Sequence, residues 1–364
     1  MWKKIGEIEA KCDRITNIPL MPEYAQKLHA VFLAKGALAT TAIEGNTLSE
    51  EEVMGIVKGE AKIPEVKKYL QQEVENIIHG CNGIFKELKS GGDKRITVKE
   101  IKEYNALVLK DLPLEKGEKP GHIRQKEFGV PGYRGAPAKE CQYLLDRMCE
   151  WLNEEIEPKG KELHFAYWLI KAILFHLYLV WIHPFADGNG RTARLLEFKC
   201  LLASGVPTPT AHLLSNYYNE TRDEYYRQLS QASKSGGEII PFISYAIDGF
   251  LEELNKHLNE ITEQQIDVHW TSYVHEQFRE KTKKIDRRRR QVALDLGKQK
   301  DFVPISKIRD LSAEAARRYG NLSIRSVSYD LKVLKELGLV IISGSKAMAN
   351  RQKILGLLPQ TMKR

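Results

Sequence analysis

An apolar stretch in the middle of the chain, followed at once by a dense polar loop, constrains the fold more than any other feature. Residues 172–182 are apolar apart from His176. Such a stretch is too short to span a bilayer and predicts a buried helix. We therefore expect helices over 164–182 and 190–204, joined by the loop H-P-F-A-D-G-N-G-R-T-A-R at 183–194, which we call the motif loop.

Helical spacing of apolar residues runs through most of the remaining chain. It predicts further helices over 22–44, 65–89, 97–110, 138–154, 219–232 and 238–260. Ser49 and Glu52 form a capping box that opens another helix. Residues 120–137 differ, because their many glycines and prolines exclude a helix and indicate a short hairpin or an extended loop. The expected fold class is therefore all-α with one short hairpin.

The composition is that of a soluble globular protein, with 42% hydrophobic and 29% charged residues. No secretion signal is visible in the sequence. The five cysteines form neither a CxxC pair nor a Cys/His metal spacing, which indicates reduced thiols and no structural zinc. We therefore expect a cytoplasmic protein that contacts no membrane.

Positive charge is concentrated at the C-terminal end. Residues 281–364 contain 21 Lys/Arg and 7 Asp/Glu, a net charge of +14, which leaves residues 1–280 at −6 because the whole chain carries +8. Helices over 288–297 and 312–318, a third helix capped by Ser323, and a strand pair that begins at 339–342 and has a loop around 344–350 follow one another here. That order predicts a winged helix.

A winged helix places its recognition helix in the DNA major groove. The candidate is 323–337, and its outward residues are Arg325, Ser326, Ser328, Tyr329, Lys332 and Lys335. The positive charge suits phosphate contacts. DNA binding and a role in protein contacts are the two alternatives for this domain.

The motif loop combines side chains and backbone groups that handle phosphate. Gly188, Asn189 and Gly190 let the backbone turn and expose N–H groups at a helix N-terminus, which attracts anions. Arg191 and Arg194 are three residues apart in the first helical turns, so both can face the same anion.

Two more side chains of this loop complete the set. Asp187 is a lone carboxylate among phosphate-binding groups, which suits a Mg²⁺ ion shared with phosphate oxygens. His183 is suited to proton transfer near neutral pH, whereas Phe185 is expected in the core. Together these groups can move a phosphorus group onto a hydroxyl. The alternative is a capped interhelical turn whose arginines pair with surface carboxylates.

The twelve residues of the motif loop resemble, without departure, the signature of the Fic family: His, any residue, Phe, any residue, Asp or Glu, Gly-Asn-Gly-Arg, two residues, Arg. The similarity extends over residues 95–245 and includes the glycine- and proline-rich segment. This resemblance implies an all-helical core that transfers AMP from ATP to a Ser, Thr or Tyr hydroxyl of a protein.

The resemblance also implies a role for each residue of the loop. His183 would deprotonate the target hydroxyl, and Asp187 would hold Mg²⁺ at the α- and β-phosphates. The amides of 188–190, together with Asn189, would bind the α- and β-phosphates. Arg191 would contact the β-phosphate, and Arg194 would hold the γ-phosphate and so orient the α-phosphate for in-line attack.

Two further segments are similar to parts of the family. The segment 120–137 matches a flap, whose extended backbone can align a target by strand pairing; a plain surface loop is its alternative. In Y-N-E-T-R-D-E-Y-Y-R-Q-L, Tyr225 and Tyr226 are candidates for contact with the adenine, although aromatic residues at helical spacing more often belong to a core.

The stretch T-T-A-I-E-G-N at 40–46 resembles an inhibitory helix of the family, placed here at about residues 36–46. Thr40 and Glu44 are one helical turn apart and would share a face. The resemblance implies that Glu44 pairs with Arg194 and displaces the γ-phosphate, so that the chain restrains itself. In some relatives this glutamate positions a water that removes AMP from the target. A helix end with a solvated glutamate is the alternative.

These expectations divide the chain into an N-terminal helical region (1–94), a Fic catalytic core (95–245), a helical connector (246–286) and a winged-helix domain (287–360). The predicted function is a protein adenylyltransferase that uses ATP and Mg²⁺ on a protein target, with the protein itself as one candidate target. The alternatives are a DNA-binding regulator whose Fic core senses nucleotide, and a Fic enzyme that removes AMP or uses another donor, such as UTP or a CDP-linked group. Relatives often dimerise, so a homodimer is a further candidate.

Overall fold

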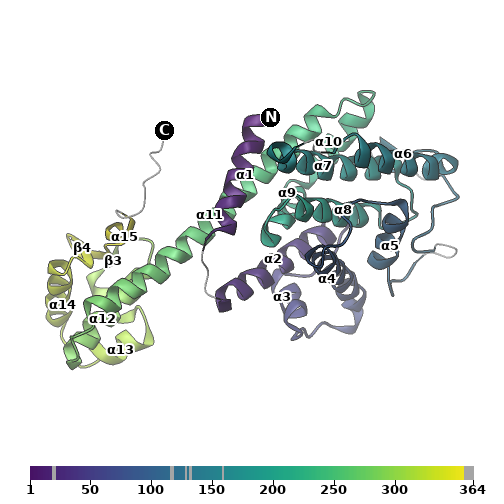
Figure 1. The fold of residues 1–364 in the computed structure, drawn as a ribbon. Helices are drawn as coiled ribbons and strands as arrows, with labels where there is room; N and C mark the ends of the chain where they lie inside the picture. Colours follow the sequence, from purple (N-terminus) through teal and green to yellow (C-terminus); the bar gives the residue numbers. More distant parts are fainter. Residues whose placement is uncertain (19–21, 115–118, 128, 131–132, 158–159, 356–364) are drawn as a thin grey trace. The chain divides into compact units, whose positions relative to one another are not determined.

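The structure of the chain is a computed structural model that describes all residues except 19–21, 115–118, 128, 131–132, 158–159 and 356–364. It divides into two compact units, residues 1–257 and 258–364 (Figure 1). One long helix, α11 (Ile240–Gln277), runs across this boundary. The residues expected to form a connector, 246–286, therefore lie in both units.

The described part of the first unit is built from helices and one hairpin. The helices are α1 (Trp2–Thr16), α2 (Pro22–Ala42), α3 (Glu50–Lys58), α4 (Lys68–Lys89), α5 (Val98–Val108), α6 (Cys141–Glu154), α7 (His164–Ile182), α8 (Asn189–Ala203), α9 (Leu213–Glu220), α10 (Arg222–Lys234) and the first part of α11, with 3-10 turns at Glu65–Lys67, Ala138–Glu140, Lys161–Leu163 and Thr208–His212. The hairpin pairs β1 (Gly129–Val130) with β2 (Tyr133–Arg134) in antiparallel register. The predicted helical fold with a short hairpin is confirmed.

Helix α7 forms the core of the first unit and packs along α8 (Figure 1). Nearly all of its residues are buried, including Phe175, His176 and Leu177. By length and composition alone α7 could cross a membrane, but 78% of its most apolar window is buried inside the unit. It is the buried helix that the sequence predicts, and it fixes where the motif loop begins.

Local sequence explains how the 40–46 segment is placed. Helix α2 ends at Ala42, two residues before the expected end, and the turn that follows contains Gly45 with a φ of 101°. Glycine adopts this left-handed conformation without strain. The chain then enters α3 through the predicted capping box, in which the Glu52 N–H donates to Ser49 Oγ at 3.2 Å.

The second unit combines helices with a three-stranded antiparallel sheet. Its elements are the rest of α11, α12 (Lys284–Gly297), β3 (Val303–Pro304), a 3-10 turn (Ile305–Asp310), α13 (Ala313–Tyr319), α14 (Ile324–Glu336), β4 (Val340–Ser343), β5 (Lys346–Ala349) and α15 (Gln352–Leu355), with the strands in the order β3-β5-β4. Trp270 and Val274 of α11 share a core with Leu331 and Leu334 of α14. The assignment of this unit to the winged-helix class stays a prediction.

The expected strand pair is present, but the loop expected around 344–350 is wrong in detail. The chain makes a tight turn at Gly344 and Ser345 and continues directly as β5, with Ser343 opposite Lys346. Gly344 has a φ of 57°, which a two-residue hairpin turn requires and glycine tolerates. The sequence alone did not separate this turn from a longer loop.

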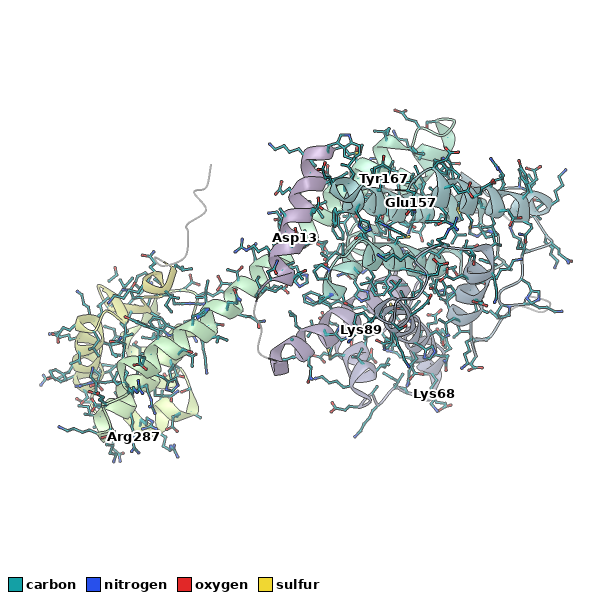
Figure 2. All side chains as sticks on the ribbon, in the orientation of Figure 1. Asp13, Lys68, Lys89, Glu157, Tyr167 and Arg287 are labelled. Atoms are coloured by element: carbon teal, nitrogen blue, oxygen red, sulfur yellow. The ribbon has the colours of Figure 1, made fainter. Side chains whose placement is uncertain are left out.

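A buried carboxylate fixes α14 to α12 and α13. Asp330 is fully buried and accepts hydrogen bonds from Arg288 Nε at 2.7 Å, Arg289 Nε at 2.8 Å and the Tyr319 hydroxyl at 2.8 Å. Two arginines of the R-R-R-R run therefore stabilise the fold. Arg287, labelled in Figure 2, is exposed at the start of the same helix.

Candidate active site

The motif loop links α7 to α8 through two residues with left-handed backbone. His183 ends α7 with a φ of 48° and a ψ of 57°, and Gly188 precedes α8 with a φ of 77°. Glycine adopts this conformation freely, whereas a histidine in it costs about 1–3 kcal/mol. The surroundings must therefore hold His183 in place.

Arg124 provides that support from the segment before the hairpin. Its Nε donates to the His183 carbonyl at 2.7 Å, its backbone N–H to the Pro184 carbonyl at 2.9 Å and its Nη1 to the Lys126 carbonyl at 2.8 Å. Its Nη2 donates to the Ala136 carbonyl, beyond β2. Segments on both sides of the hairpin are thereby tied to the loop that carries the histidine.

Asn189 closes the motif loop from inside. Its Oδ1 accepts from the Phe185 N–H at 3.0 Å, and its Nδ2 donates to the Phe185 carbonyl at 2.8 Å. Both residues are buried. The side chain of Asn189 thus shapes the loop. The Gly188 N–H donates to Asp187 Oδ1 at 2.5 Å, and the first backbone N–H groups of a helix have no partner within the helix.

Asn105 of α5 fixes the other side of the loop. Its Nδ2 donates to the Asp187 carbonyl at 2.9 Å, and its Oδ1 accepts from the Gly121 N–H at 2.9 Å. Thr192 Oγ1 in addition donates to the Gly188 carbonyl at 2.8 Å. These contacts hold the backbone of the loop at Asp187, while the Asp187 side chain is 50% exposed.

The environment of His183 favours its neutral form. Burial lowers the pKa of His183, and the Arg124 guanidinium acts in the same direction. The Val180 carbonyl and the carboxylates of Glu44 and Asp187 oppose this shift without reversing it. A histidine of this kind is unprotonated at neutral pH and can accept a proton.

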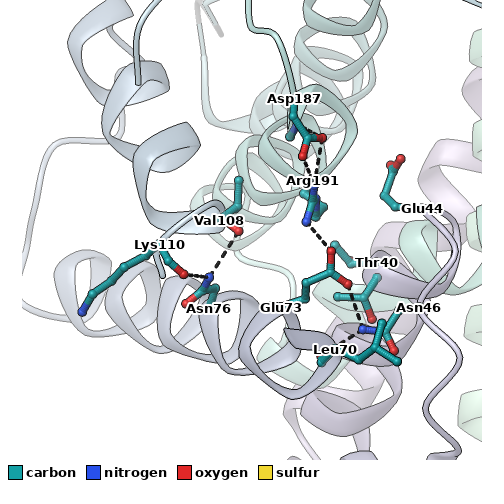
Figure 3. A network of polar contacts seen from close by, with 12 residues as sticks. Thr40, Glu44, Asn46, Leu70, Glu73, Asn76, Val108, Lys110, Asp187 and Arg191 are labelled. Atoms are coloured by element: carbon teal, nitrogen blue, oxygen red, sulfur yellow. Dashed lines mark hydrogen bonds and ion pairs between the residues drawn. The ribbon is translucent and has the colours of Figure 1, made fainter. Parts of the chain in front are cut away.

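Arg191 bridges two carboxylates (Figure 3). Its Nη2 donates to Oδ1 and Oδ2 of Asp187 at 2.9 and 3.0 Å, and its Nη1 donates to Glu73 Oε1 of α4 at 2.7 Å. The Arg191 side chain is only 5% exposed. The first arginine of the motif loop is therefore paired with carboxylates from two different elements.

Arg194 contacts the segment that the sequence predicts to be inhibitory. Its Nη2 donates to Glu44 Oε1 at 2.5 Å and to the Thr40 carbonyl at 2.9 Å, and its side chain is 1% exposed. A Cβ on Gly190 would collide with Glu44 Oε1. The Glu44 carboxylate thus rests against the start of α8, where a phosphate is predicted to bind.

The two tyrosines of α10 lie in different surroundings. Tyr225 is buried, and its hydroxyl lies 2.9 Å from His176 Nε2 in the core. Tyr226 is 37% exposed. Partial burial raises the pKa of its hydroxyl; the charge of Glu44 acts in the same direction and the charge of Arg194 opposes it. Of the two, Tyr226 is the one with free surface beside the loop.

The loop offers one carboxylate to a divalent cation. Across the described residues, no three His, Cys, Asp or Glu side chains gather in a group that could hold a metal, and the cysteines are free and buried. Mg²⁺ usually takes one or two protein carboxylates and fills its other positions with phosphate oxygens and water. Asp187, half exposed beside the N-terminus of α8, fits an ion that arrives with a nucleotide.

Three residues of the site carry no sequence signal. Glu73 belongs to a long amphipathic helix, Asn105 to another, and Arg124 to a segment in which only glycine and proline stand out. Each acts through contacts with residues far away in the chain. Such pairs could have been found from sequence only if the tertiary arrangement were known.

Comparisons with known proteins agree with this geometry. Residues 95–201 match the model of the Fic/DOC family. The chain is 33% identical over 208 residues to the protein adenylyltransferase fic-1 of Caenorhabditis briggsae, covering 57% of this chain and 37% of that protein. It is 30% identical over 222 residues to the protein adenylyltransferase Fic of Drosophila ananassae, covering 60% and 40%. This chain therefore contains a Fic domain homologous to protein adenylyltransferases.

Solved structures of Fic proteins have a fold similar to that of this chain. Residues 134–508 of Fic-1 from C. elegans superpose with a TM-score of 0.55 at 26% identity, covering 71% of this chain and 72% of that one. A Fic family protein from Desulfovibrio desulfuricans G20 superposes with a TM-score of 0.56 over 94% of both chains; at 18% identity this likeness concerns the fold alone. The chain spans well under half the length of the two curated relatives.

Proposed function

We propose that the chain transfers AMP from ATP to a hydroxyl side chain of a protein, and that Glu44 restrains this transfer. One observation carries the proposal: the short motif loop joins His183, at the end of α7, to Asp187, Arg191 and Arg194 at the N-terminal end of α8. A helix end of this kind binds phosphate groups. Homology to protein adenylyltransferases supports the same chemistry.

In the proposed reaction, the oxygen of a target hydroxyl attacks the α-phosphorus of ATP. The bond from this phosphorus to the oxygen that bridges to the β-phosphate breaks, and pyrophosphate leaves. His183, neutral because its pKa is lowered, takes the proton of the hydroxyl. The amides at the start of α8 and Arg191 bind the phosphates, and Arg194 binds the γ-phosphate. Mg²⁺ held by Asp187 would neutralise phosphate charge.

The proposed brake follows from competition for Arg194. Glu44 Oε1 lies 2.5 Å from Arg194 Nη2, so the γ-phosphate and this carboxylate cannot both use the same donor. ATP can reach a productive position only when Glu44 withdraws. The segment 120–137, the predicted flap, would align the target segment by strand pairing.

The test uses ATP labelled at the α-phosphate or at the γ-phosphate, with Mg²⁺, the Glu44→Gly protein and a cell lysate that supplies targets. We expect stable label from the α-position and none from the γ-position, on lysate proteins or on the chain itself. Labelled UTP and a labelled CDP-linked compound are tested in parallel as alternative donors. Absence of label from ATP with a folded Glu44→Gly protein would exclude AMP transfer. Label from UTP alone would show that UTP, and not ATP, is the donor.

The opposite direction of the reaction has its own readout. Release of labelled AMP from a modified target by the native protein, and a slower release by Glu44→Gly, would indicate that Glu44 positions a water for removal of AMP. Equal release by both proteins would exclude this role of Glu44.

A second candidate function, DNA binding, rests on the second unit. Helix α14 exposes Arg325, Tyr329, Lys332 and Lys335 on one stretch, and buried Asp330 fixes the helix to its neighbours. Gel shifts with duplex DNA at graded salt test this, because phosphate contacts weaken steeply as salt rises. A shift that Lys332→Ala weakens would support DNA binding, and no shift at low salt would remove it.

A further inference from the structure

Glu73 of α4 belongs to no motif, yet it contacts the candidate site. Its Oε1 accepts from Arg191 Nη1 at 2.7 Å, and its Oε2 accepts from Asn46 Nδ2 at 2.9 Å (Figure 3). Both oxygens are thus used, and the side chain is 16% exposed. One carboxylate therefore joins the first arginine of the motif loop to the segment that carries Glu44.

This contact also involves the predicted metal ligand. Arg191 gives one terminal nitrogen to Glu73 and the other to both oxygens of Asp187. With this pairing, Nη1 and Nη2 of Arg191 each donate to a carboxylate, whereas Nε has no hydrogen-bond partner among the described residues. Carboxylates therefore occupy both terminal nitrogens of Arg191 and one terminal nitrogen of Arg194, namely Nη2.

Asn46 links the contact between Glu73 and Arg191 to the turn that carries Glu44. Its Nδ2 also donates to the Leu70 carbonyl at 2.9 Å, and its Oδ1 accepts from the Leu48 N–H at 3.0 Å. Glu44 and Asn46 are separated only by Gly45. A movement of this turn that withdraws Glu44 from Arg194 therefore also moves the hydrogen-bond donor of Glu73.

We propose that Glu73 is a second carboxylate of the brake, which occupies Arg191 as Glu44 occupies Arg194. This inference rests on the proposed function in one respect, namely that Arg191 binds the β-phosphate. Three carboxylates (Glu44, Glu73 and Asp187) face the two arginines of the motif loop, so these five side chains carry a net charge of −1 where a polyanion must bind. Removing the charge of Glu73 makes this group of five side chains neutral and frees Nη1 of Arg191 for phosphate.

The experiment measures the Kd of Mg²⁺–ADP by titration calorimetry. ADP has a β-phosphate but no γ-phosphate, so its affinity reports Arg191 separately from the contact of Glu44 with Arg194. The variants are Glu73→Gln, Glu73→Ala and Glu44→Gly. Glu75→Gln is the matched control, because Glu75 lies on the same helix and its carboxylate accepts from Gln71 at 2.7 Å.

We expect Glu73→Gln to tighten Mg²⁺–ADP binding about threefold to tenfold, and Glu73→Ala to act in the same direction. Glu75→Gln should leave the Kd unchanged. Weaker binding in both Glu73 variants would make Glu73 a positioning residue for Arg191, and an unchanged Kd would make its contact structural; either result overturns the proposal. Thermal melting confirms that each variant is folded.

AMP transfer then separates this inference from the proposed function. In the Glu44→Gly background, Glu73→Gln should raise transfer further at ATP concentrations below saturation. If Glu44→Gly transfers no AMP while Glu73→Gln still tightens Mg²⁺–ADP, the proposed function fails and the role of Glu73 stands. If Glu44→Gly is active and the Kd for ADP does not respond to Glu73→Gln, the role of Glu73 fails alone.

Discussion

At the scale of single residues, both arginines of the motif loop are held by carboxylates that are distant in sequence. Glu44 pairs with Arg194 and Glu73 with Arg191. A buried arginine that loses its partner keeps the cost of its own burial. The resting state therefore needs these carboxylates for stability, even though they compete with the proposed substrate.

This dependence gives a thermal prediction. Glu44→Gly leaves Arg194 without its carboxylate, so the melting temperature of the free protein should fall, by about 2–4 °C for each kcal/mol lost in a unit of this size. ATP with Mg²⁺ supplies a new anionic partner and should raise the melting temperature of Glu44→Gly more than that of the native chain. Differential scanning fluorimetry measures both. An equal ATP response in the two proteins would argue against competition at Arg194.

The pH dependence of transfer follows from His183. Its pKa is lowered mainly by burial, and Glu44, which opposes this, is absent in Glu44→Gly. Protonation removes the base, so kcat/KM should fall as the pH falls, with the acid limb below the ordinary histidine pKa of about 6.5. Replacing His183 by Gln in that background should cost about 10²–10⁴-fold in rate. An acid limb above pH 6.5, or little loss in the Gln variant, would contradict the role of His183 as base.

At the scale of elements, Arg124 joins the segments on both sides of the hairpin to the motif loop. Its hydrogen bonds reach carbonyls before the hairpin, after it and at the end of α7. The strained backbone of His183, with a φ of 48°, accepts one of these hydrogen bonds. The geometry of the histidine thus depends on a side chain outside the motif.

We predict that Arg124→Ala in the Glu44→Gly background lowers the rate of AMP transfer by about tenfold to a hundredfold, because misplacement by about 1 Å can cost that much. The Kd for Mg²⁺–ADP should stay within a factor of about two, since Arg124 supports His183 rather than the phosphate-binding groups. Lys126→Ala is the control, because its side chain is exposed on the same segment. A parallel loss of nucleotide affinity would show that Arg124 holds the whole loop instead.

The sequence predicts the elements of the site better than the contacts between them. Helical periodicity and glycine positions locate α7, α8 and the loop that joins them, since these signals are local. Glu73 and Arg124 escape this reasoning because their partners lie on other elements. The end of α2 at Ala42 and the turn at Gly344 differ from the sequence prediction for a related reason: propensity fixes a helix end or a turn only to within a few residues.

At the scale of the whole molecule, the chain consists of two compact units with separate cores, residues 1–257 and 258–364. The motif loop and its partners lie in the first unit, and the basic helices lie in the second. Each unit should therefore respond to mutations in its own core.

Asp330→Ala tests this independence. The substitution leaves Arg288, Arg289 and Tyr319 without a shared acceptor in the core, which should destabilise the second unit by about 3–5 kcal/mol. Urea unfolding should show one transition shifted to lower denaturant, while AMP transfer by the Glu44→Gly form stays unchanged. A loss of transfer together with the shifted transition would show that the two units are energetically coupled.

The most direct test of the account compares AMP transfer by three purified proteins with α-labelled ATP and Mg²⁺: the native chain, Glu44→Gly, and Glu44→Gly combined with His183→Ala. We expect weak label with the native chain and none with the double variant. Glu44→Gly should give at least about tenfold more label than the native chain, because a competing charge pair is removed. Equal label with the native chain and Glu44→Gly would contradict the brake. Undiminished label with the double variant would contradict the chemistry assigned to the motif loop.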